Sequence, residues 1–241
     1  MKTIPILMYH QVDRVPAPGS ALRNLTVSPA SFERQMQCLK QWGFKGMSML
    51  DLEPYLSGSL QGRVVGITFD DGYANTHNHA LPILVKHGFT ATCYAVTHQI
   101  GGHNQWDVPM GMAEKPLMDA SAWRHWIDSG MDVGSHTCDH TDLSQADEAS
   151  ARFQIHQSKT ELEHMFGISV RHFCYPYGRF LPAQMDWVAQ AGYASATTTQ
   201  RGRVHTTQAI NPYALPRVLV NHRTTWAHLA LKLFTAYEDR R

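Results

Sequence analysis

The sequence lacks the features that mark several common classes of protein. Its four cysteines, Cys38, Cys93, Cys138 and Cys174, form no Cys-x-x-Cys pair. A zinc ribbon or a dithiol redox site therefore has no support, and reduced, packed thiols are expected. No run of Lys or Arg stands out and the formal net charge is +1, so the electrostatic footprint of a nucleic-acid-binding protein is missing.

Long apolar segments are also missing. No stretch approaches the about 18 consecutive apolar residues that a transmembrane helix needs, so no integral membrane segment is expected. The first residues, MKTIPILMYHQVD, hold a short apolar run that Pro5 interrupts and His10 stops. That run is too short for a secretion signal, and no small-residue cleavage site follows it. We therefore expect a soluble, cytoplasmic protein.

What the sequence does show is a regular alternation of short apolar runs and amphipathic segments. One helix is well marked, because Ser28 can cap it, Pro29 suits its first turn and Gly43 can end it. We expect strands over 4–9, 44–49, 63–69, 89–96, 131–136, 171–176, 193–198 and 214–220. We expect helices over 28–43, from 50, and over 76–88, 119–130, 145–167, 181–192 and 224–241, with a long loop over 97–117.

This alternation predicts an α/β fold with a parallel sheet and helical crossovers. Seven or eight such units fit a TIM-like (β/α) barrel, complete or incomplete, better than an open doubly wound sheet. No internal repeat, low-complexity tract or linker interrupts the chain. We therefore expect a single domain over residues 1–241.

Histidine is abundant, with 15 copies, and several histidines and aspartates directly follow predicted strands. The polar residues in this position are His10, Asp70, Asp71, His136, His140, Tyr177 and His222. The carboxyl ends of the strands meet on one face of a parallel barrel, which is where active sites of such barrels lie. The topology therefore predicts that these distant segments converge on one pocket.

Two of these groups have the chemistry of a metal site. His136 and His140 have an H-x-x-x-H spacing that lets two imidazoles reach one ion. Asp70 or Asp71 can supply a carboxylate, and the cation would offset the repulsion between the two adjacent charges. The other aspartate would then be free to act as a base. Without the aspartate pair, the two histidines would be interpreted as ordinary loop residues that bind no metal.

At this point the sequence resembles a known family. The motifs TFDDGY, SHTCDH and YPYG occur in that order and are similar to the first three motifs of the polysaccharide deacetylases of the NodB-homology type, carbohydrate esterase family 4. ILMYH near the start and LPRVLV near the end look like the surface-polysaccharide biosynthesis branch. The resemblance covers nearly the whole chain and implies one NodB-type domain. It also implies a metal-dependent hydrolase that removes an N-acetyl or N-formyl group from an amino sugar.

The resemblance also implies a role for each motif residue. Asp70 would be the general base. Asp71, His136 and His140 would bind a divalent metal, most readily zinc, which acidifies a water and polarises the amide carbonyl. The backbone N–H of Tyr177 would help to hold the oxyanion. The substrate would be an N-acetylated amino sugar, as an oligosaccharide or as a lipid- or nucleotide-linked precursor.

Two departures from the family pattern leave alternatives open. The family's third motif often reads Arg-x-Pro-Tyr, with an arginine that orients the base, but Cys174 occupies that position here. Arg171 is offset by three residues, and Arg217 on the last predicted strand could replace the arginine. In the family, the acid that protonates the leaving nitrogen is a histidine in a Leu-x-x-His motif, which His222 matches in LVNH. His10 is the rival candidate.

Other readings of the same residues remain. Trp106, in the long loop, could stack on a sugar ring or could simply anchor the loop. Asp139 could support the metal histidines or be solvated. Two histidines and one carboxylate can also hold Fe(II) for oxygen chemistry. The replaced arginine leaves room for a protein that binds carbohydrate without turning it over.

Overall fold

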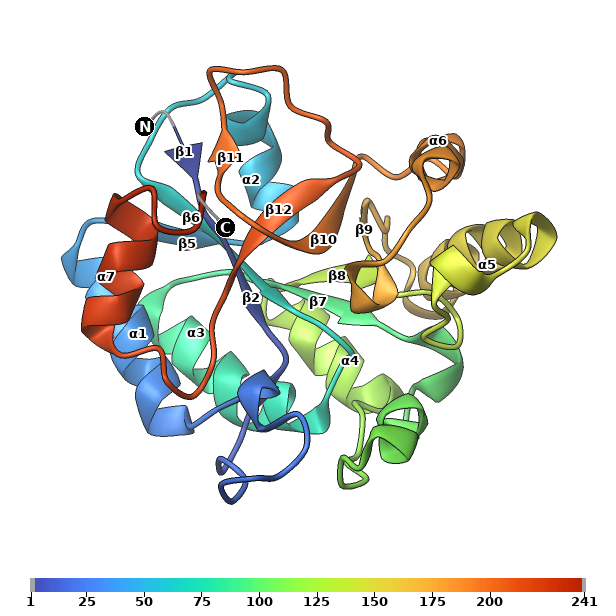
Figure 1. Cartoon of the computed structure of the whole chain (residues 1–241), viewed down its shortest axis with the longest axis horizontal. Coiled ribbons are helices and arrows are strands. Elements are labelled where there is room, and N and C mark those ends of the chain that lie inside the picture. The colour runs from blue at the N-terminus through green and yellow to red at the C-terminus, as the bar shows by residue number, and fades with distance from the viewer. Residues whose placement is uncertain (1–2, 240–241) are drawn as a thin grey trace.

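The computed structural model describes residues 3–239 and contains a closed barrel of seven parallel strands (Figure 1). In order around the ring the strands are β2 (Ile6–Tyr9), β12 (Leu215–Leu219), β10 (Ser195–Arg201), β9 (His172–Cys174), β8 (Asp132–Ser135), β7 (Thr92–Ala95) and β6 (Val64–Phe69). The pairing of β2 with β6, in which Ile6 faces Gly66 and Tyr9 faces Phe69, closes the ring. The expected (β/α) barrel is therefore confirmed.

The eighth parallel strand, β5 (Lys45–Met47), is not a member of the ring. It pairs with the first half of β6, where Lys45 faces Val64, while the second half of β6 pairs with β7. The N–H of Thr90, just before β7, donates to the carbonyl of Gly46 at 3.3 Å. β5 is thus inserted between two barrel strands at their N-terminal ends, where a Cβ at Gly46 would lie 2.7 Å from Phe89.

Helices connect successive barrel strands, except β10 and β12, and pack around the ring (Figure 1). The helices are α1 (Pro29–Gln41), α2 (Met49–Leu56), α3 (Leu81–His87), α4 (Ala120–Asp128), α5 (Glu148–Phe166), α6 (Pro182–Gln190) and α7 (Trp226–Phe234). The predicted cap of α1 is present, since Ser28 Oγ accepts from the N–H of Ser31 at 3.2 Å. Short strands β1 (Thr3–Ile4) and β11 (Val204–His205) pair with each other, as do β3 (Gln11–Val12) and β4 (Thr26–Val27).

Two predicted segments differ from the structure. The segment expected as one helix over 76–88 begins with a π-helical turn, Thr76–Ala80, before α3. The last helix ends at Phe234 rather than at 241, because Thr235 adopts an extended backbone (φ −124°, ψ 169°). Residues 240 and 241 of that prediction lie outside the described residues. The loop over 97–117 contains two 3-10 turns, Thr97–Gln99 and Gln105–Met110.

The main apolar core lies between the barrel and its helices. Tyr9 and Phe69 stack at 5.4 Å between ring centroids, and Phe69 meets the edge of Trp126 at 6.1 Å. All three side chains are at most 1 % exposed, so they anchor β2, β6 and α4 to one another through aromatic packing. No helix within residues 3–239 has the length and apolarity required to cross a bilayer.

Candidate active site

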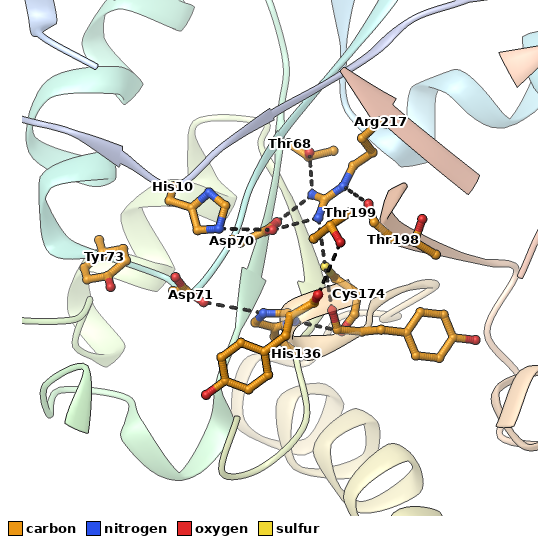
Figure 2. A network of polar contacts seen from close by, with 12 residues as sticks. His10, Thr68, Asp70, Asp71, Tyr73, His136, Cys174, Thr198, Thr199 and Arg217 are labelled. Atoms are coloured by element: carbon orange, nitrogen blue, oxygen red, sulfur yellow. Dashed lines mark hydrogen bonds and ion pairs between the residues drawn. The ribbon is translucent and has the colours of Figure 1, made fainter. Parts of the chain in front are cut away.

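A pocket of about 380 Å³ opens at the carboxyl ends of the barrel strands. The lining residues with acid–base or ligand chemistry are His10, Asp70, Asp71, Asp107, His136 and His140, with Tyr177 beside them. Six of these seven residues are ones that the sequence predicted to converge. Figure 2 shows four of them, His10, Asp70, Asp71 and His136, which come from the ends of three strands and point toward one another.

Asp71, His136 and His140 form the candidate metal centre. The Nε2 atoms of His136 and His140 lie 3.4 and 3.3 Å from the same carboxylate oxygen, Oδ1 of Asp71. One potential ligand atom from each residue lies within 4.8 Å of the others. All three residues are buried, and two imidazoles with one carboxylate form a donor set that zinc and other divalent metals accept.

Neighbouring groups orient both imidazoles. His136 Nδ1 lies 2.7 Å from the carbonyl oxygen of Cys174. Because a carbonyl can only accept, Nδ1 carries a proton, and Nε2 is the ring nitrogen that faces Asp71. The His140 ring is stacked on Trp106 (4.4 Å, 14°) and meets the ring of Tyr177 edge-on at 4.6 Å. The residues present therefore fit a metal ion at this place.

The second aspartate, Asp70, is held by Arg217. Nη1 and Nη2 of Arg217 donate to Oδ1 and Oδ2 of Asp70 at 2.6 and 2.7 Å. Arg217 is fully buried and also donates to Thr68 Oγ1 and to the carbonyl of Thr198 (Figure 2). Burial raises the pKa of Asp70, but the charge and hydrogen bonds of Arg217 outweigh it and hold that pKa below its ordinary value.

The two alternatives for the missing motif arginine occupy opposite ends of the barrel. Arg171 precedes β9 and forms an exposed pair with Glu53, at 2.7 Å from Nε to Oε1. Arg217 crosses the inside of the barrel to Asp70, and its Nη2 lies 3.3 Å from the sulfur of Cys174. The small Cys174 side chain therefore stands next to the guanidinium group that reaches the base position from another strand.

The two histidines considered for the acid lie in different places. His10 follows β2, lines the pocket and has its Nε2 3.7 Å from Asp70 Oδ2. His222 lies in the turn before α7, where its Nε2 accepts from Arg23 Nη1 at 2.6 Å. His10 belongs to the lining of the pocket, whereas His222 lines a separate surface hollow with Ser31 and Thr225. The structure therefore brings His10, and not His222, to the pocket.

Tyr177 and Gly178 form a tight turn after β9. Tyr177 has a left-handed backbone (φ 59°, ψ 2°) although it is not glycine. Gly178 has φ 68°, and a Cβ there would lie 2.0 Å from Thr199 Oγ1. The Thr199 hydroxyl donates to the Tyr177 carbonyl at 3.2 Å, which fixes the orientation of the turn beside His140.

Comparison with known proteins decides the family. Residues 57–196, more than half of the 241-residue chain, match the family profile described as polysaccharide deacetylase. The chain belongs to the polysaccharide deacetylase family. The family resemblance noted from the motifs is thereby confirmed.

Individual relatives agree with this family and with the barrel. The poly-beta-1,6-N-acetyl-D-glucosamine N-deacetylase of Staphylococcus aureus (strain MRSA252) is 27% identical over 209 residues, which is 83% of this chain and 69% of the relative. The structure of Streptococcus pyogenes deacetylase PplD in complex with acetate matches with a TM-score of 0.82 at 27% identity, over 97% of this chain and 99% of that one. BC0361, a polysaccharide deacetylase from Bacillus cereus, gives 0.80 at 27% identity, over 96% and 69%.

The sequence motifs of this deacetylase-family chain did not reveal Asp107. It lies in the 3-10 turn Gln105–Met110, is 4 % exposed and lines the pocket. The hydroxyl of Tyr73, the last residue of TFDDGY, donates to Asp107 Oδ2 at 2.9 Å. Burial and the charge on Asp71 raise the pKa of Asp107, against hydrogen bonds from Tyr73 and Asn104 that lower it. From the sequence, Trp106 is the residue of this loop for which a role in the site is expected.

Backbone strain concentrates around the pocket of this family member. Within residues 3–239, the non-glycine residues with positive φ are Leu22, Asp71, Thr137, His140 and Tyr177. Four of these five line the pocket, and Thr137 lies between the two metal-site histidines in the chain. Left-handed backbone costs energy in non-glycine residues and tends to cluster at functional sites.

Proposed function

We propose that this protein is a metal-dependent hydrolase that removes an N-acetyl or N-formyl group from an amino sugar in a polysaccharide or its precursor. The observation that carries the proposal is the convergence of Asp71, His136 and His140 on one point, with Asp70 directly beside them. Asp70 is a carboxylate outside the proposed ligand set but next to it, so it could take a proton from the attacking water during hydrolysis. The family of the chain supports the same reaction class.

We assign Asp71, His136 and His140 as ligands of the metal and zinc as the ion. When bound there, a zinc ion would lower the pKa of a bound water and polarise the amide carbonyl. The protein's part is to present two oriented imidazoles and one buried carboxylate. Burial raises the pKa of Asp71, but the hydrogen bonds with His136 and His140 outweigh it and keep the carboxyl group ionised.

Asp70 acts as the general base and Arg217 positions it. The paired guanidinium nitrogens fix the plane of the carboxylate inside the barrel. Because its pKa is held below the ordinary value, Asp70 is ionised at neutral pH and ready to accept a proton from the attacking water. Arg217, on β12, thereby fills the role that the motif arginine of the family would have at the position of Cys174 on β9.

The leaving nitrogen receives its proton from His10. This histidine lines the pocket beside Asp70, whereas His222 is engaged with Arg23 outside it. The carbonyl of His10 accepts from the Thr76 hydroxyl at 3.2 Å, which holds the residue at the barrel mouth. The backbone N–H of Tyr177, in the strained turn next to His140, is assigned to the oxyanion.

The substrate class is an N-acetylated amino sugar, and Trp106 supplies one wall of the pocket that receives it. The Staphylococcus aureus relative named above acts on poly-beta-1,6-N-acetyl-D-glucosamine. Oligomers of β-1,6-linked N-acetylglucosamine are therefore the first substrates to test, followed by N-formylated, lipid-linked and nucleotide-linked amino sugars.

The deciding experiment measures acetate released by the zinc-loaded protein from these sugars. Asp70→Asn is the matched variant, because it keeps the three proposed ligands and removes the base. We expect full zinc content in both proteins and acetate release only in the parent. Release of neither acetate nor formate by a parent that holds zinc would contradict the hydrolase proposal. Oxygen uptake by the iron-loaded protein would favour the oxygenase alternative.

A further inference from the structure

Among the described residues, one carboxylate of the proposed active site has no ion-pair partner. Asp70 is paired with Arg217, and Asp71 faces the two metal-site histidines. Asp107 lines the same pocket but has no ion-pair partner among residues 3–239, and its hydrogen-bond donor Tyr73 is a neutral hydroxyl. A buried carboxylate without a counter-charge is costly, so a cationic ligand at this point would be favoured.

The loop that carries Asp107 is fixed rather than adaptable. Asn104 is fully buried, and its Oδ1 accepts from the N–H of Lys115 at 2.6 Å, which closes the loop at its base. The N–H of Met112 donates to the Asp107 carbonyl at 3.2 Å. Tyr73, also fully buried, orients the carboxylate from the turn that holds Asp71. A carboxylate held this way is pre-organised for a ligand.

The arginines that line the pocket follow other strands than Asp107. Asp107 belongs to the loop after β7, whereas Arg201 ends β10, three strands away in the ring of seven. Arg179 lines the pocket and is paired with Asp142 at 2.9 Å. Arg201 is itself paired with Glu238, so within residues 3–239 neither arginine provides a counter-charge for Asp107.

We infer that Asp107 is a binding site for the protonated amino group of a free amino sugar. This inference rests on the proposed function, because amide hydrolysis turns a neutral acetamido group into an amine that takes up a proton. A partly deacetylated oligomer would then bind in this pocket more tightly than a neutral oligomer of the same shape. Asp107 would select chains that already carry free amino groups, and would also hold the product.

Direct binding tests this site without relying on turnover. Zinc-loaded protein is titrated by calorimetry with a β-1,6-linked glucosamine tetramer and, separately, with the glucose tetramer of the same linkage. Neither sugar carries an acyl group. We expect the parent to prefer the glucosamine tetramer, and Asp107→Asn to lose roughly tenfold or more in affinity for it while its affinity for the glucose tetramer is kept. Glu114→Gln, an exposed neutralisation in the same loop, should keep the preference.

Each other outcome decides against the site. A parent without preference, a preference that survives in Asp107→Asn, or an equal loss for both tetramers would overturn the inference. If Asp107→Asn does not fold, Tyr73→Phe decides, because it removes the hydrogen bond that orients the carboxylate. We expect a smaller loss in the same direction, and an unchanged preference would overturn the site. An intact preference in a protein that releases no acyl group would contradict only the proposed function.

Discussion

Arg217 and Asp70, 147 residues apart in the sequence, form a two-point ion pair inside the barrel, at 2.6 and 2.7 Å. Their strands, β12 and β6, are not neighbours, because β2 lies between them in the ring. The guanidinium group therefore crosses the interior to reach the carboxylate (Figure 2). Both groups are almost completely removed from solvent, so the loss of either leaves the other buried without a counter-charge.

The first prediction concerns this pair. Arg217→Met should lower the free energy of unfolding by about 3–5 kcal/mol, because it leaves Asp70 buried and unpaired. Urea denaturation gives the value, and the double variant Asp70→Asn/Arg217→Met should recover most of it. The control is Arg171→Met, since its exposed pair with Glu53 should contribute no more than about 1 kcal/mol. A larger loss in the control than in Arg217→Met would contradict the prediction.

The second prediction separates the two histidines. His10→Ala should reduce kcat for acetate release by about 10²–10⁴-fold, because the leaving nitrogen loses its proton donor. His222→Ala should leave kcat unchanged, because that side chain contacts Arg23 rather than the pocket. Steady-state kinetics on β-1,6-linked N-acetylglucosamine oligomers gives both values. The reverse ranking would place the acid on the segment after β12.

The third prediction concerns the metal. Chelation should abolish acetate release and zinc should restore it, and zinc should raise the melting temperature of the parent through preferential binding to the folded state. His140→Ala should lose this thermal shift. His98, Cys138 and Glu161 form another group close enough to hold an ion, so His98→Ala is the control. Loss of the shift in His98→Ala, with its retention in His140→Ala, would place the ion at the other cluster.

The fourth prediction is a dependence of stability on pH. Burial lowers the pKa of His98, but Asp139 and Glu161, at 2.8 and 3.2 Å from its ring nitrogens, raise it above the ordinary 6.5. A raised pKa in the folded state stabilises the protein fully below the unfolded value, and this contribution is lost as pH rises through the folded value. The difference in unfolding free energy between the parent and His98→Gln should therefore shrink from mildly acidic to alkaline pH. A constant or growing difference would contradict it.

Much of the architecture was readable from the sequence for physical reasons. Buried parallel strands are short continuous apolar runs, such as Val64–Phe69, and helices begin at capping residues such as Ser28. Residues directly after such strands must meet at one mouth, which is why Asp71, His136 and His140 could be placed together. The position of β5, which pairs with β6 but is not a member of the closed ring, was not predictable, because it depends on strand register and not on composition.

The limits of sequence reasoning also have a physical cause. Motif order could not choose between Arg171 and Arg217, because the choice depends on which end and which face of a strand carries the side chain. His222 follows a strand as His10 does, yet it contacts Arg23 and does not line the pocket. Asp107 lies in an irregular segment without periodicity, so its place in the pocket lining could be found only from the structure.

Cys174 touches both halves of the site, since its carbonyl holds the ring of His136 and its sulfur lies against Arg217. An arginine side chain at position 174 on β9 would occupy the volume that the guanidinium group of Arg217 fills. It would also place two positive charges next to the single carboxylate of Asp70. The two placements of the arginine therefore exclude each other. An arginine at position 174, as is usual in the family, would fit only if Arg217 were replaced by a smaller, uncharged residue.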